Sequence, residues 1–217
     1  MDYVMRLIVL AAVCLAPTFA QDAGPDNKPV IDNDRVTVWD VTWMKGQTNP
    51  ARGHDVDAVV MRISGSTAGS KAGNKAGSAY FSPKGDKRDE HGEANSPAGA
   101  PRSLIIELKD HPVAPIENKT GYPLAFPRPH VKKLLENNRV IVWSYRWNPG
   151  EPTPMHFHDK DVVVVYLEDT ALTSTTPDGA KTVNNYKAFD IRFNKGDRTH
   201  TELLDHGTGS AMMMELK

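Results

Sequence analysis

The chain has 217 residues, of which 26 are Lys or Arg and 27 are Asp or Glu, and its formal net charge is −1. A sequence pI of about 6.7 gives no broad positive field, which excludes binding to nucleic acid or to an anionic membrane surface as the main function. Hydrophobic residues make up 39% of the chain and charged residues 24%, so it can bury a core and is not disordered throughout.

Residues 1–20 have the pattern of a secretory signal peptide. Arg6 precedes an apolar run from Leu7 to Leu15, and small residues lead up to Ala20. The run is shorter than the ~20 apolar residues that a membrane span requires. We therefore expect cleavage after Ala20, export to the periplasm or the extracellular space, and no membrane span in the mature chain.

The single cysteine, Cys14, lies inside this leader. A mature chain without a thiol excludes disulfides, thiolate nucleophiles and cysteine-based zinc sites. Any metal ion must then be held by histidine, aspartate or glutamate.

The sequence contains an internal duplication. Residues 33–46 and 137–150 are identical at seven of fourteen positions at an offset of 104, and residues 103–109 resemble 211–217 at the ends of the two copies. Both copies are rich in β-branched and aromatic residues, which is typical of strands. The duplication predicts an all-β protein made of two tandem sandwich or barrel units.

We expect the first unit to span residues 21–120 and the second 121–217, with the boundary in the Pro-rich stretch 112–129. Residues 65–100 carry repeated Ala-Gly tetrapeptides and are expected to form a mobile insertion in the first unit. Val131–Asn137 has a short helical pattern, the only such segment predicted.

Strand patterns are clearest in the second copy. Along residues 139–147, Ile141, Trp143, Tyr145 and Trp147 fall on one face. The continuous apolar run from 162 to 167 predicts a strand that is covered on both faces. The four tryptophans of the chain occupy equivalent positions in the two copies, which favours core packing over a sugar-binding platform.

Histidines in the second copy have the spacing of metal ligands. His156 and His158 follow the turn residue Gly150 and would share one face of a strand. His200 and Glu202 have the same spacing about forty residues later. Three imidazoles from two strands would form a three-histidine metal site, and Glu202 is a candidate fourth ligand.

These residues resemble the motifs of the cupin superfamily. Gly150, His156 and His158 match the spacing of the first cupin motif, and Gly196 with His200 matches the second more loosely. With the duplication, the resemblance covers the mature chain and implies a bicupin, two tandem jelly-roll barrels with a metal ion inside at least one.

The chain departs from the cupin pattern in both copies. Val162, beside Asp161, stands where the glutamate of the first motif is expected. In the first copy, Arg52 and Asp89 align with His156 and His200, and of the three histidines only His54 is kept. We expect the first barrel to bind no metal and to contain an Arg52–Asp89 ion pair instead.

The resemblance implies one divalent transition metal ion: iron, manganese, zinc or nickel. It favours an exported metal-dependent dioxygenase, isomerase or lyase acting on a small polar substrate, with Glu202, Asp161 and Tyr145 as candidate acid–base groups. The alternative is a non-catalytic small-molecule-binding or structural bicupin, so whether the protein is an enzyme remains open. A homodimer is compatible with either function.

Overall fold

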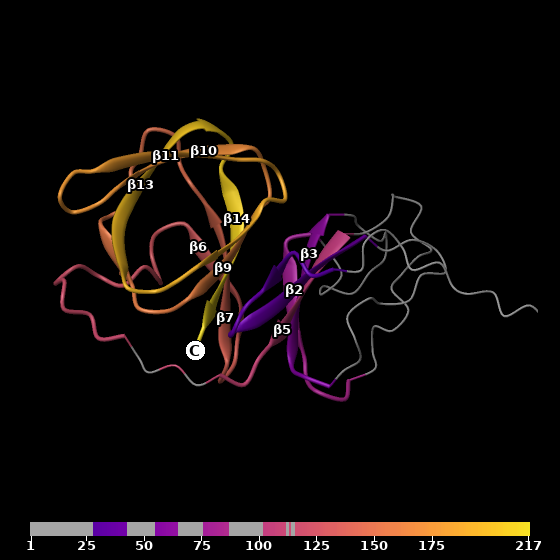
Figure 1. Cartoon of the computed structure of the whole chain (residues 1–217). Coiled ribbons are helices and arrows are strands. Elements are labelled where there is room, and N and C mark those ends of the chain that lie inside the picture. Colours follow the sequence, from indigo (N-terminus) through magenta and orange to yellow (C-terminus); the bar gives the residue numbers. More distant parts are fainter. Residues whose placement is uncertain (1–27, 43–54, 65–75, 87–101, 112, 114–115) are drawn as a thin grey trace, which may run out of the picture.

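The computed structural model describes residues 28–42, 55–64, 76–86, 102–111, 113 and 116–217. Within these ranges the regular secondary structure is β-strand, arranged in three antiparallel sheets. The expected all-β fold is confirmed (Figure 1).

The second half of the chain forms a jelly-roll barrel from two sheets. One sheet has the order β12-β9-β14-β7-β6 and the other the order β11-β10-β13-β8. The strands of the first sheet are β6 (Val131–Glu136), β7 (Val140–Arg146), β9 (Val162–Tyr166), β12 (Ile191–Asn194) and β14 (Ser210–Leu216). Those of the second sheet are β8 (His156–His158), β10 (Thr170–Thr175), β11 (Lys181–Tyr186) and β13 (Arg198–Gly207).

The described residues of the first half form one five-stranded sheet with the order β1-β2-β5-β3-β4. Its strands are β1 (Ile31–Asp32), β2 (Val36–Thr42), β3 (Ala58–Ser64), β4 (Ser78–Ser82) and β5 (Arg102–Leu108). This order matches that of the β6-containing sheet, because β1, β2, β5, β3 and β4 correspond to β6, β7, β14, β9 and β12.

The duplicated sequence produces duplicated local structure. The side-chain oxygens of Asn33 and Asn137 each accept hydrogen bonds from the amides two and three residues later, a turn that starts β2 and β7. In the second half, the indole of Trp143 donates to Glu215 across to β14 at 2.8 Å. The first half repeats this bond, and Trp39 donates to Glu107 at 2.9 Å.

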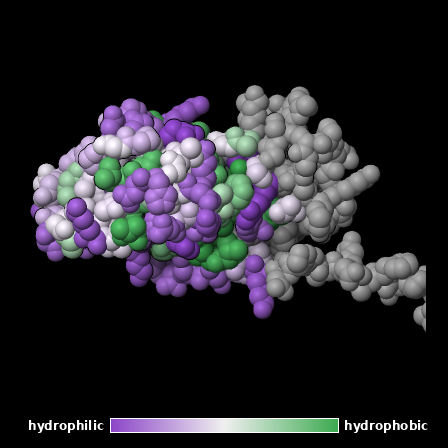
Figure 2. Space-filling view, turned by 90° about the horizontal axis from the view of Figure 1, so that it is seen from above, coloured by the Kyte–Doolittle hydropathy of each residue, from purple (hydrophilic) through white to green (hydrophobic). Residues whose placement is uncertain are grey.

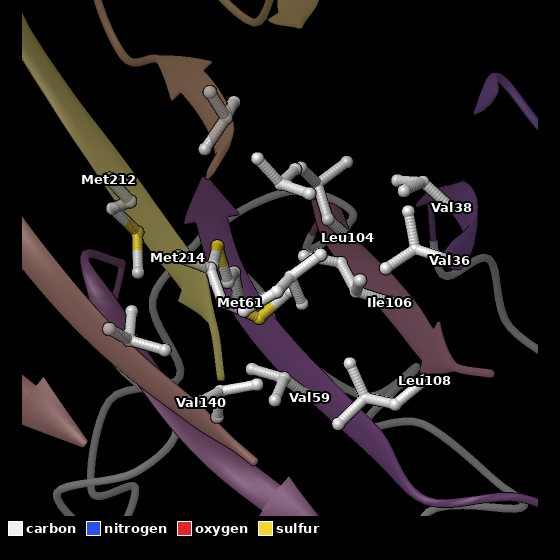
Figure 3. Packing of buried hydrophobic residues seen from close by; sticks show 14 of the residues in the cluster. Val36, Val38, Val59, Met61, Leu104, Ile106, Leu108, Val140, Met212 and Met214 are labelled. Carbon is white, nitrogen blue, oxygen red and sulfur yellow. The ribbon is translucent and has the colours of Figure 1, made fainter. Parts of the chain in front are cut away.

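The largest core cluster lies between the two halves. Residues of β2, β3 and β5 pack against residues of β7, β9 and β14, as the neighbouring Met61 and Met214 illustrate (Figure 3). The opposite face of β7 and β9 lines the barrel interior with Trp143, Tyr145 and Val164. Strand β9 is therefore covered on both faces, as its continuous apolar sequence predicted.

Two ion pairs cross the joint between the halves in a reciprocal pattern. Arg35 of the first half pairs with Asp161 of the second at 3.0 Å, and Arg139 of the second pairs with Asp57 of the first at 2.9 Å. Each residue is 104 positions from its counterpart. The two halves therefore meet through equivalent surfaces, like the subunits of a symmetric dimer.

Two expectations about secondary structure are wrong. The segment expected to be helical forms β6, which pairs with β7 and has a register shift between Lys133 and Leu135. This irregularity lets Leu134 and Leu135 both pack against the core, which imitates helical spacing in the sequence.

The second error concerns the insertion. Residues 78–82 lie inside the segment expected to be a mobile loop, yet they form β4 and pair with β3. Side chains of this segment alternate between two faces, as in a strand: Ala79 and Phe81 pack towards the main core, whereas Tyr80 packs on the other face. Residues 65–75 and 87–100 of the insertion lie outside the described residues.

Hydrophilic residues predominate on the face seen in Figure 2, and the hydrophobic residues there form smaller areas between them. None of the residues that the structure describes belongs to a helix long and apolar enough to cross a membrane.

Candidate metal centre

The three predicted histidines meet inside the barrel of the second half. His156 and His158 are the first and last residues of β8, so their side chains leave the strand on one face. Strand β13 pairs antiparallel with β8 and places His200 opposite His156. The ligand atoms of the three imidazoles lie within 4.8 Å of one another, and the ring centroids are 4.8–5.0 Å apart.

The hydrogen bonds of these rings leave nitrogens available for a cation. Nδ1 of His156 lies 2.7 Å from the carbonyl oxygen of Pro154, so this nitrogen donates and Nε2 keeps its lone pair. Nδ1 of His158 and Nε2 of His200 are buried without a hydrogen-bond partner. Buried polar atoms are normally satisfied. The residues present therefore fit a divalent transition metal ion bound by imidazole.

Burial keeps two of these histidines neutral at physiological pH. Burial, reinforced by the positive charge of Arg128, lowers the pKa of His156 to about 4. Burial and the charge of Arg198 lower the pKa of His158 to about 2. A metal ion binds the neutral imidazole, so His156 and His158 need not release protons near pH 7 to bind it.

Glu202 lies beside the cluster and is held by other groups. Its Oε2 accepts hydrogen bonds from Trp147 at 3.0 Å and from Arg128 at 3.4 Å, while Oε1 lies 3.6 Å from Nε2 of His200. Burial alone would raise the pKa of this carboxyl, but His200 and Arg128 outweigh it and the pKa is lowered. Glu202 falls outside the compact group of three histidines. Its role as a fourth ligand stays a prediction.

Arg128, like Arg198, is a site residue that the sequence analysis did not identify. The segment before it runs along β8, where Phe157 forms backbone hydrogen bonds of 2.8 Å with both Pro123 and Ala125. This docking places Nη1 of Arg128 3.2 Å from Nε2 of His156. An arginine between two prolines carries no ligand pattern, so the sequence offered no signal for it.

A cavity of about 80 Å³ adjoins the cluster. Its wall includes His158, His200 and Glu202 together with two arginines, Arg128 and Arg198, and its other lining residues are uncharged. The arrangement can hold a cation on the imidazoles and present positive charge to a small ligand beside it.

The other two acid–base candidates, Tyr145 and Asp161, lie in different places. Tyr145 lies next to the site, with its ring centroid 4.1 Å from the guanidinium of Arg128, and burial raises its phenol pKa. Asp161 was expected near the ion, and this is wrong. Its carboxylate binds Arg35 and the amide of Gly196 at the joint between the halves, and it does not line the cavity.

The expected ion pair of the first barrel, Arg52 with Asp89, lies outside the described residues, as do His54 and His91. His206 is exposed near the end of β13.

Comparison with known proteins finds a relative whose sequence matches part of this chain. The chain matches no protein-family model. It is 42% identical over 60 residues to the "Beta-alanine degradation protein BauB" of Pseudomonas aeruginosa. The match covers 28% of this chain and 59% of that relative, so the chain spans less than two thirds of it.

Solved structures resemble the chain more broadly. Protein YlbA from E. coli covers 87% of this chain and 86% of its own, with a TM-score of 0.51 and 10% identity. A cupin domain from Bordetella pertussis covers 43% of this chain and 99% of its own, with 25% identity and a TM-score of 0.38. A cupin 2 conserved barrel domain protein from Leptotrichia buccalis covers 87% of both chains, with 11% identity and a TM-score of 0.44.

The likeness to YlbA extends over both halves and shows the fold alone. Because the match covers 87% of this chain, it includes both the sheet of the first half and the barrel of the second. The chain therefore shares its overall β fold with YlbA across both halves, and the described part of its second half forms the jelly-roll barrel.

Proposed function

We propose that this chain is an exported bicupin that binds one divalent transition metal ion and acts on a small polar substrate as a metal-dependent dioxygenase, isomerase or lyase. The observation that carries the proposal is the group of three buried imidazoles beside a small cavity, two of which, His158 and His200, have a nitrogen without a hydrogen-bond partner. Held by three neutral imidazoles, a divalent ion would keep its full charge and open coordination positions, supplying Lewis-acid or oxygen chemistry.

The residues around the three histidines would position the substrate. Arg128 and Arg198 present positive charge to the cavity, and the ionised Glu202 lies within reach of His200. The partial relative is named for the degradation of beta-alanine, which supports a small polar substrate. Glu202 is the acid–base candidate that the geometry supports best, because it lines the cavity whereas Asp161 does not.

A non-catalytic binding module is the second candidate. It is favoured by Nη1 of Arg128, which lies 3.2 Å from Nε2 of His156 and gives that nitrogen a partner in the absence of metal. In this case the cavity would bind a small molecule without chemistry at a metal ion.

The experiment that separates the two candidates is elemental analysis of the purified protein. We expect close to one transition metal ion per chain. His156→Ala combined with His158→Ala should abolish binding, since too few imidazoles remain. His206→Ala is the matched control, because this histidine is exposed on β13, and it should leave the stoichiometry unchanged. A metal-free wild-type protein, or metal retained in the double variant, would contradict the proposed site.

A further inference from the structure

Arg128 is a buried cation whose hydrogen-bonding capacity is largely unused. Its side chain is 6% exposed, and its guanidinium lies 4.1 Å from the ring centroid of Tyr145 and 5.0 Å from that of Phe126. Its Nε is buried without a partner. A guanidinium has five N–H donors, and a buried one normally meets a carboxylate through two parallel bonds. Here Glu202 provides one contact, at 3.4 Å.

The cavity beside Arg128 carries excess positive charge. Among its lining residues, Arg128 and Arg198 each carry +1 and Glu202 carries −1, which leaves +1 while the histidines are neutral. A divalent ion on the histidines would raise this to +3. Charge of one sign in a buried space is costly unless an anion compensates it. The cavity of about 80 Å³ is far below the roughly 300 Å³ of a pocket for a drug-sized molecule, so the anion must be small.

Arg128 also competes with a metal ion for one ligand atom. Because Nδ1 of His156 donates to the Pro154 carbonyl, Nε2 holds the only lone pair of this ring. That lone pair accepts from Nη1 of Arg128 at 3.2 Å, and it cannot serve a metal ion at the same time. Metal binding must therefore release Nη1, which adds a free donor to the unpartnered Nε.

We infer that the cavity binds a small carboxylate through Arg128, and that this anion and the metal ion each strengthen the binding of the other. The metal releases the guanidinium from His156, and the carboxylate occupies the released guanidinium and offsets its charge. Arg128 therefore weakens metal binding when no anion is present and strengthens it when the anion is bound. This inference rests on the proposed metal site and names the ligand class of that site.

The test measures Zn²⁺ affinity by titration calorimetry, with and without saturating acetate. Acetamide is the matched probe, because it has the shape of acetate without the charge. In the wild type, acetate should increase Zn²⁺ affinity at least tenfold and acetamide should not. Arg128→Met should bind Zn²⁺ more tightly than the wild type without acetate, because the competing cation is gone. In this variant, acetate should increase the Zn²⁺ affinity less than threefold.

Two further variants keep the test decisive. Arg128→Lys retains the positive charge and packing but loses the planar donor fork, so its acetate effect should be reduced. Arg146→Met, on the exposed end of β7, should behave like the wild type. Zn²⁺ binding that is weaker in Arg128→Met, or an acetate effect that survives in it, would overturn the inference. A wild type that binds no Zn²⁺ would overturn the proposed function and the linkage together, whereas Zn²⁺ binding without an acetate effect would overturn this inference alone.

Discussion

Two buried histidines, His156 and His158, make the stability of the metal-free protein sensitive to acid. The folded-state pKa is about 4 for His156 and about 2 for His158, whereas an unfolded chain binds the proton near pH 6.5. Below pH 6.5 the unfolded state therefore binds more protons than the folded state, and stability falls as the pH falls. The lowered pKa of Glu202 acts only below its unfolded value of 4.5. Burial raises the pKa of Glu215, which acts above pH 4.5 in the opposite direction, so the histidine contribution is isolated by comparing variants.

We predict that the free energy of unfolding of the metal-free protein falls as the pH is lowered from 6.5 to 4.5. Well below pH 6.5, the loss should approach roughly 1.4 kcal/mol per pH unit for each of these two histidines. Urea unfolding in the presence of a chelator, at pH values between 7.5 and 4.5, measures it. The combined His156→Gln and His158→Gln variant should have a distinctly shallower slope. Equal slopes for this variant and the wild type would show that the two rings do not control acid stability.

At the scale of strands, the site depends on how the loop after β7 is fastened to β13. Thr153 is buried, and its hydroxyl accepts a hydrogen bond from the amide of Glu202 at 2.8 Å. Its own amide donates to the carbonyl of Glu202 at 2.8 Å, and its carbonyl accepts from the hydroxyl of Thr201. These bonds hold the segment that leads into His156 against the strand that carries His200.

Thr153→Val should therefore lower both stability and metal affinity. The substitution keeps the side-chain shape and leaves the Glu202 amide without its acceptor, which costs about 1–3 kcal/mol. Thermal melting and metal titration measure the two effects. Thr173→Val on β10 is the control, because the hydroxyl of Thr173 donates to Asp205 in an exposed bond and is remote from the loop. If both variants lose metal affinity equally, Thr153 does not hold the segment before His156 against β13 in the way described.

The sequence predicted those elements whose signal is local. The alternating β7 segment, the apolar β9 and the paired histidines on β8 and β13 all lie where their spacing placed them. Strand β6 was misread because its register shift imitates helical spacing. Arg128 could not be predicted, since its position depends on a non-local contact between its segment and β8.

At the scale of the molecule, the two reciprocal ion pairs are equivalent in sequence and unequal in environment. The side chains of Arg35 and Asp161 are 10% and 14% exposed, whereas those of Arg139 and Asp57 are each 25% exposed. Loss of one partner leaves a charge that is harder to hydrate when it is more buried. The sequence repeat predicts the equivalence but not this asymmetry, which arises from packing between the halves.

Asp161→Asn should therefore destabilise the protein more than Asp57→Asn. We expect losses of roughly 3 kcal/mol for the more buried pair and about 1 kcal/mol for the more exposed pair, measured by urea unfolding. Both variants should keep their metal ion, because neither carboxylate lines the cavity. Loss of metal in Asp161→Asn with unchanged stability would instead show that this carboxylate acts at the metal site and not at the joint.

The reciprocal joint also changes what mutation can do to this protein. In a dimer of identical subunits, every substitution appears twice, and a change that suits one surface must suit its copy. Here the two surfaces belong to one chain, so each can change alone while the tether keeps its partner at high local concentration. Assembly of the halves is unimolecular, and dilution cannot separate them. In a chain built in this way, one half can retain the three histidines while the other half stabilises it by packing against it.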